Sequence, residues 1–185
     1  LSFMIFTTAN LSAINSKAGT AAYSFLKIGV GARAVALGNS FVGMADDESA
    51  IYYNPAGMSR IPNYALSTSY HNYVADIQGG YLSAVLPWGD GRKLGFAINY
   101  LNFGDTPETN NAGEVIGDFG GGDLAFTAAY SQPLMEQLYM GIAGKFIYES
   151  IDSFTSTGMA LDIGLLYEFE DGHTSLGAVA SNLGF

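Results

Sequence analysis

From residue 63 onward, large apolar residues alternate with small or polar residues at a period of two. Because successive side chains of a β-strand point to opposite faces, this period predicts strands with one apolar face. The opposite face holds mainly Gly, Ala and Ser, with acidic residues at Asp162 and Glu168. The pattern is regular in 64–70, 94–100, 124–130, 138–148 and 159–169, and it is weaker in 77–86 and 173–183. The sequence therefore predicts seven strands.

The longer stretches match the roughly 9–11 residues of a tilted membrane-spanning strand, whereas strands of soluble domains average about 5–6 residues. A soluble β-sandwich is the alternative, but its second face would carry Lys, Arg, Glu and Thr toward water. On the membrane interpretation Ile163 faces lipid, where arginine costs about 2–4 kcal/mol near the midplane, while serine at the interior-facing Gly164 costs much less. Tyrosines near strand ends are candidates for an interfacial girdle: Tyr64, Tyr70, Tyr100, Tyr130, Tyr148 and Tyr167.

The connections between the predicted strands alternate in length. In outer-membrane barrels, short turns lie on the periplasmic side and long loops lie outside, so the first strand is expected to run outward. The longest connection is acidic and glycine-rich, and we expect a solvated loop there, with weak calcium contact or partner binding as alternatives. Short connections are expected at 88–91, 132–137 and 170–172, and longer ones at 72–78, 104–122 and 150–157.

The composition agrees with an exported membrane protein. The chain has 24 Gly, 12 Tyr, 12 Phe and no Cys, and only 13% of its residues are charged. No apolar run approaches the roughly 20 residues that a transmembrane helix needs, so we expect strands to span the membrane. The formal net charge of -10 argues against nucleic acid as a partner.

Residues 29–61, which precede the strands, have a different pattern. Small residues around Arg33 form a weakly helical run that is broken at Gly38, and an acidic cluster that includes Asp46 and Asp47 follows. Small residues allow a backbone to pack closely against a wall. We therefore expect this segment to fold as short helical pieces inside the barrel, with Arg33 paired to Asp46 or Asp47 in the interior.

Three motifs of this segment carry a resemblance to a known family. They are Gly31-Ala32-Arg33-Ala34 with Ala36-Leu37-Gly38, then Ala45-Asp46-Asp47, and the turn-forming Tyr53-Asn54-Pro55-Ala56-Gly57. With these motifs the chain resembles the PorV/PorQ family of outer-membrane β-barrels, relatives of the FadL long-chain fatty acid transporters. The resemblance implies an all-β, antiparallel transmembrane barrel of about fourteen strands when complete, with a short helical N-terminal plug. It makes eight residues candidates for function: Gly31, Arg33, Gly38, Asp46, Asp47, Asn54, Pro55 and Gly57.

We interpret the chain as three parts. Residues 1–13 are expected to be the remnant of a secretory signal, cleaved after Ala9 or Ala13, with a buried helix start as the alternative. Residues 14–62 are expected to form the plug, and residues 63–185 the first half of the barrel. Because an open sheet edge cannot face lipid, we expect further strands to follow at the C-terminal end.

The sequence offers little for catalysis, and we expect no enzyme activity, no cofactor and no metal. Asp46 and Asp47 have no third ligand at a recognisable spacing, and helix capping or pairing with Arg33 explains them better. The two histidines, His71 and His173, have no nucleophile signature beside them.

Two functions remain open at this stage. Resemblance to PorV implies a non-enzymatic component of the type IX secretion system, whose partners are secreted cargo proteins and other secretion-system subunits. Resemblance to FadL implies passive uptake of a hydrophobic ligand such as a long-chain fatty acid, with the plug as gate. In both cases the protein is expected in the bacterial outer membrane, in contact with its lipid.

Overall fold

The computed structural model describes residues 23–74, 76–110 and 112–184, so the expected signal remnant at 1–13 and residues 14–22 of the expected plug lie outside the described residues. The described residues are mostly antiparallel β-structure, with 59% strand and 12% helix. Four short helical elements come first: η1 (Ser24–Lys27), α1 (Ala32–Ala36), α2 (Ala50–Tyr53) and η2 (Pro55–Arg60). Seven strands follow: β1 (Ala65–Asn72), β2 (Gln78–Pro87), β3 (Lys93–Thr109), β4 (Val115–Met135), β5 (Leu138–Ile151), β6 (Phe154–Glu168) and β7 (Ser175–Gly184).

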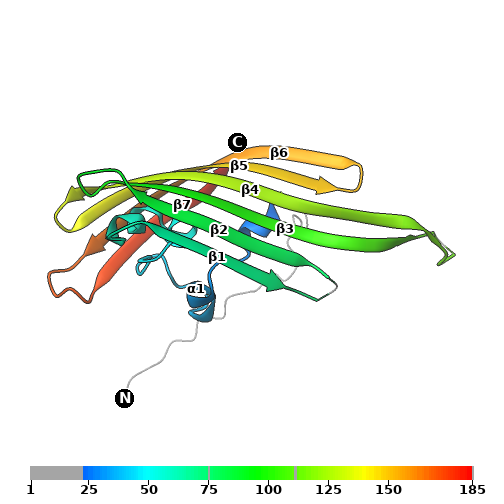
Figure 1. The fold of residues 1–185 in the computed structure, drawn as a ribbon, viewed down its shortest axis with the longest axis horizontal. Helices are drawn as coiled ribbons and strands as arrows, with labels where there is room; N and C mark the ends of the chain where they lie inside the picture. The colour runs from blue at the N-terminus through cyan, green and yellow to red at the C-terminus, as the bar shows by residue number, and fades with distance from the viewer. Residues whose placement is uncertain (1–22, 75, 111, 185) are drawn as a thin grey trace, which may run out of the picture.

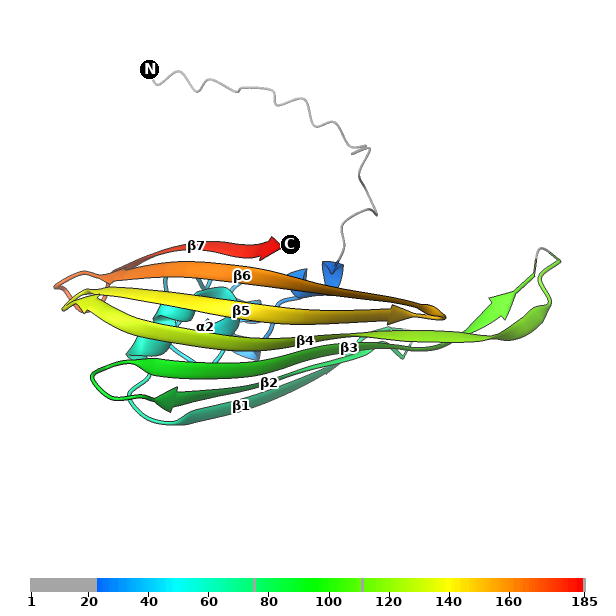
Figure 2. The same cartoon turned by 90° about the horizontal axis from the view of Figure 1, so that it is seen from above.

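The seven strands form one sheet in the order β1-β2-β3-β4-β5-β6-β7, and every pairing is antiparallel. The prediction of seven consecutive antiparallel strands is confirmed. The sheet is curved, and the helical elements lie on its concave side, as Figures 1 and 2 show.

The alternation of residue types sorts the side chains onto the two faces of the sheet. On β6, Ile163, Leu165 and Tyr167 are 36–43% exposed on the convex face, whereas Asp162 and Leu166 are fully buried on the concave face. Small residues dominate the concave face of the other strands, and they leave room for the helical elements to pack against the sheet.

Strands β3 and β4 are longer than predicted, and the expected loop at 104–122 is wrong. Most of it is a hairpin in which Asp105 pairs with Gly120 and Glu108 with Gly117. This hairpin extends beyond the other strands (Figure 2). The sequence did not reveal it because these residues are polar and glycine-rich and lack a regular apolar alternation. The connection expected at 150–157 is likewise only a tight turn.

The interior lies between the helical elements and the concave face. Its larger cluster joins Phe41, Ile51 and Met58, all with no exposed surface, to Val85 and Ala97 of the sheet. Burial of such side chains contributes about 1.5–3 kcal/mol each, so this contact holds the helical elements in place. No helix of the described residues is long enough and apolar enough to cross a membrane.

Candidate functional site

The eight candidate residues lie in residues 24–61, which we call the helical segment. It contacts β4, β5 and β6 most extensively through η2. The structure places six of the candidates in two groups, while Gly31 and Gly38 flank α1. Asn54, Pro55 and Gly57 lie buried against the sheet, and Arg33, Asp46 and Asp47 form a partly exposed polar cluster.

Asn54 connects the helical segment to the sheet. Its side chain is fully buried, and its Nδ2 donates to the carbonyl oxygens of Val42, at 2.9 Å, and Leu165 of β6, at 3.0 Å. Its Oδ1 accepts from the backbone N–H of Ala56, which caps the start of η2 with Pro55 in the first turn. A buried amide without hydrogen-bond partners costs free energy, so these hydrogen bonds hold Asn54, and with it the helical segment, against the sheet.

Glycines allow the backbone of the segment to touch its neighbours directly. A Cβ atom at Gly57 would overlap the backbone of Ala45, and one at Gly141 of β5 would overlap the backbone of Pro55. At Gly164 of β6 a Cβ atom would overlap the Oδ1 of Asn54. This overlap contradicts the expectation that serine at Gly164 costs little, because the interior is filled at this position.

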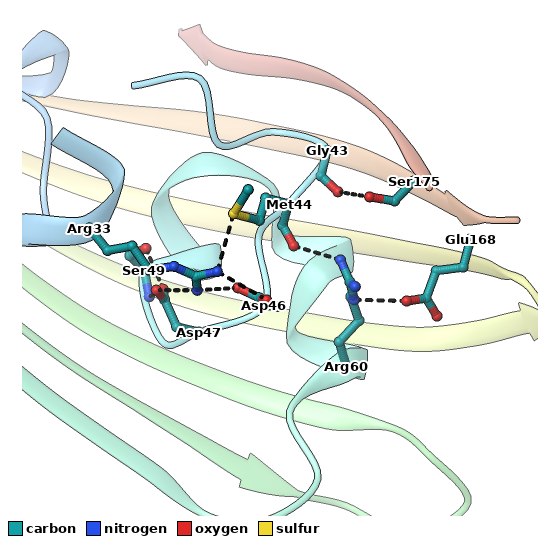
Figure 3. A network of polar contacts seen from close by, with 9 residues as sticks. All are labelled: Arg33, Gly43, Met44, Asp46, Asp47, Ser49, Arg60, Glu168 and Ser175. Atoms are coloured by element: carbon teal, nitrogen blue, oxygen red, sulfur yellow. Dashed lines mark hydrogen bonds and ion pairs between the residues drawn. The ribbon is translucent and has the colours of Figure 1, made fainter. Parts of the chain in front are cut away.

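The predicted pairing of Arg33 is confirmed. Its guanidinium forms an ion pair with Asp46, its Nη1 lies 3.4 Å from Asp47 Oδ2, and its Nη2 lies 3.2 Å from the sulfur of Met44 (Figure 3). The hydrogen bond to Asp46 raises the pKa of Arg33. The side chain of Arg33 is 51% exposed, so the pair is not buried as expected, and exposed pairs contribute only about 0–1 kcal/mol.

Asp47 lies just before α2 but does not cap it as expected, because the N-cap residue is Ser49 and no side chain makes a cap hydrogen bond there. Its Oδ1 accepts from the backbone N–H of Ser49, at 2.9 Å, and from the Ser49 hydroxyl, at 2.5 Å, just before α2 begins. The Asp47 carboxylate therefore contacts both Ser49, at the start of α2, and Arg33. These two contacts hold the segment together around the acidic cluster.

Gly31 and Gly38 have backbone roles at the two ends of α1. Both have positive φ, 75° and 64°. At the end of α1 the N–H of Gly38 donates to Val35 and the N–H of Asn39 donates to Ala34, both at 2.9 Å. This is a Schellman motif, in which a residue of left-handed conformation ends the helix. Gly38 therefore terminates α1.

A second contact between segment and sheet was not predicted. The guanidinium of Arg60 at the end of η2 pairs with Glu168 of β6 at 2.9 Å and also donates to the carbonyl oxygen of Met44 (Figure 3). The hydroxyl of Ser175 at the start of β7 donates to the carbonyl oxygen of Gly43, at 2.7 Å. The alternation placed Glu168 on the interior side, but spacing alone does not pair residues 108 positions apart.

Two neighbouring tyrosines hold the first half of the segment. The Tyr53 hydroxyl lies 2.8 Å from Asn39 Oδ1 and accepts from the N–H of Val30, at 3.1 Å. The Tyr52 hydroxyl donates to the carbonyl oxygen of Leu26, at 2.5 Å. Burial raises the pKa of both tyrosines, so both remain neutral at physiological pH.

A buried ionic network lies beside Tyr52. Lys145 of β5 and Asp162 of β6 are 2.6 Å apart and only 3% and 0% exposed. Asn182 of β7 completes it, because its Oδ1 accepts from Lys145 and its N–H donates to Asp162, both at 2.7 Å. Asn182 lies at a register shift between β6 and β7, with φ of 54°. The alternation predicted only that Asp162 faces the interior.

An apolar cavity of about 400 Å³ lies where the helical segment meets the end of the sheet that carries the β3–β4 hairpin. It has almost no polar lining, and it is formed by Ile28, Tyr73, Val74, Ile77, Leu101 and Phe103. Among the described residues, no group of three or more His, Cys, Asp or Glu side chains is placed to hold a metal ion.

No protein-family model matches this sequence, and none of the curated protein sequences is significantly similar to it.

Proposed function

We propose that the chain forms part of an outer-membrane β-barrel of the PorV/PorQ type, a non-enzymatic component of type IX protein secretion and cell-surface attachment. One observation carries the proposal. The curved sheet has its large apolar side chains on the exposed convex face and a packed helical segment on its concave face.

The convex face has the character of a lipid contact. Five large apolar side chains lie side by side across five strands, each paired directly with the next, and they are 38–60% exposed: Leu82, Ile98, Phe126, Phe146 and Met159. Soluble monomers rarely expose such contiguous apolar surface. Hydrocarbon covers it without cost, as it covers the outward face of membrane barrels.

The two sheet edges support the proposal that the sheet is part of a closed barrel. Among the described residues, β1 and β7 each pair with one neighbouring strand only. An unpaired strand edge in hydrocarbon costs several kcal/mol for each unsatisfied amide. We propose that further strands join β7 to β1, giving about fourteen in all, as in related barrels. The helical segment then lies inside the wall as a plug.

The secretion function is tested in the bacterium that encodes the chain. Deleting the gene is expected to abolish surface attachment of cargo that carries a C-terminal sorting domain, and the wild-type gene restores it. Arg33→Ala is expected to reduce this attachment while the protein still assembles, because its exposed ion pair contributes only about 0–1 kcal/mol to stability. Arg92→Ala, on the exposed turn between β2 and β3, is the matched control. Normal cargo attachment in the deletion strain contradicts the secretion function.

The apolar cavity favours a second candidate, FadL-like passive uptake of a hydrophobic small molecule. Its volume of about 400 Å³ and its apolar lining suit an acyl chain. Filling the cavity with Ile77→Trp then lowers uptake of radiolabelled oleate, while Leu37→Trp, at an exposed residue just after α1, does not. Oleate uptake that is lost on gene deletion, with cargo attachment unchanged, selects this candidate over secretion.

A further inference from the structure

The outer part of the β3–β4 hairpin is a two-stranded ribbon, which we define as residues 103–120. Strand β2 pairs with β3 only as far as Asn102, and β5 pairs with β4 only from Gly121. Apart from one hydrogen bond at Gly120, the outer edges of the ribbon have no partner strand within the described residues, and Figure 2 shows the ribbon extending past its neighbours. An isolated pair of strands is marginally stable, and a third strand stabilises it.

The two edges of the ribbon differ. The carbonyl oxygen of Gly120 accepts from the N–H of Asp152 at 2.9 Å, so Gly120 presents its backbone groups to the β5 side. Backbone groups alternate in direction along a strand, so Asp118 presents its N–H and C=O to the same side, where they have no partner strand. Opposite Asp118 lies Pro107, whose missing N–H weakens the β3 edge. The β4 edge, at 115–119, contains no proline.

The negative charge of the ribbon indicates which class of partner it attracts. Residues 94–144 contain no Lys, Arg or His. The ribbon carries exposed carboxylates at Glu108, Glu114 and Asp118 together with exposed apolar side chains at Val115 and Ile116, which are 67% and 60% exposed. This negative field repels a second copy of the ribbon, anionic lipid and nucleic acid, and it attracts a cationic segment.

We propose that the β4 edge of the ribbon, residues 115–119, is a docking site for an extended, basic segment of a partner protein, which adds to the sheet as a further strand. Main-chain hydrogen bonds supply the affinity in such strand addition, and side chains supply the selectivity. Here Lys or Arg of the partner meets the carboxylates, and its apolar residues meet Val115 and Ile116. The site goes beyond the proposed function and does not depend on membrane insertion.

The test uses the full chain in an uncharged detergent and a fluorescent peptide of alternating lysine and valine. Fluorescence anisotropy is expected to show binding. A version whose alternate amides are N-methylated, and a version with glutamate in place of lysine, are expected to bind at least about tenfold more weakly, a loss of about 1.4 kcal/mol. Amide hydrogen exchange at 115–119 is expected to slow when the parent peptide binds.

Two variants of Asp118 separate the contribution of backbone hydrogen bonds to binding from the contribution of charge. Asp118→Pro removes both the edge-facing N–H and the carboxylate, whereas Asp118→Asn removes the carboxylate only. We expect Asp118→Pro to weaken binding about tenfold and Asp118→Asn about two- to threefold. Equal binding by the two variants, or undiminished binding of the N-methylated peptide, overturns the proposal in favour of simple charge attraction. The peptide comparison is decisive even if Asp118→Pro disturbs the ribbon.

Discussion

The Oδ1 atom of Asn54 in the helical segment occupies the space that a Cβ atom at Gly164 of β6 would need. The same amide donates to the carbonyl oxygen of Leu165, so glycine and asparagine form one contact between segment and sheet. In this structure, therefore, the motif around Asn54 that carries the family resemblance attaches the helical segment to the sheet.

Gly164→Ala is expected to destabilise the protein by about 1–3 kcal/mol, because the added methyl group displaces the Asn54 amide from its partners. Urea unfolding of the protein in lipid bilayers measures this. Gly144→Ala is the matched control, since a Cβ atom at Gly144 of β5 meets nothing within 4 Å. Equal stability of the two variants contradicts a close contact between Asn54 and the sheet.

The ion pair of Lys145 and Asp162 gives a second prediction. Lys145→Met leaves a buried carboxylate without its charge partner, and we expect a loss of about 3–5 kcal/mol. The double variant Lys145→Met/Asp162→Leu removes both charges and is expected to recover most of that loss. Unfolding free energies of the wild type, both single variants and the double variant form the cycle. A double variant as unstable as Lys145→Met argues that the pair is not a coupled buried unit.

Alkaline pH is expected to loosen the first half of the helical segment. Burial raises the pKa of Tyr52 and Tyr53 above their ordinary value of 10.0, so the fold favours the neutral phenols. Their contribution to stability is complete below about pH 10, the unfolded value, and is lost as pH rises toward the folded values.

Tyrosinate absorbance and proteolysis of the helical segment, followed from pH 9 to 12, measure this effect. Tyr53→Phe removes one titrating group and is expected to shift the loss of protection to higher pH, although it lowers stability at neutral pH by removing hydrogen bonds. If the segment of the wild type stays protected throughout, the neutral phenols do not hold it.

Much of the fold follows from the sequence because a period of two has one physical meaning in a sheet. Residues 159–169 alternate without interruption, and β6 has the predicted faces. The ribbon was missed because its glycines, such as Gly117 and Gly120, and the carboxylates around them show no apolar alternation.

The site was predictable only where its contacts are local. Arg33 lies 13 residues from Asp46, within one small-residue segment, and charge alone predicts their pairing. The contacts of Asn54 with Leu165 and of Arg60 with Glu168 cross more than 100 residues and depend on the register of the whole sheet. Position in the sequence does not give that register, so the anchoring role of Asn54 emerged from the structure.

The central claim is that the convex face contacts lipid, and a spin label on this face tests it most directly. The chain has no cysteine, so Phe126→Cys and Glu114→Cys each introduce a single site for labelling. In bilayers, we expect the label at residue 126 to be accessible to oxygen and shielded from a water-soluble nickel chelate, and the label at residue 114 on the hairpin to show the reverse. Free access of the chelate to residue 126, in protein that co-sediments with the bilayers, contradicts the account.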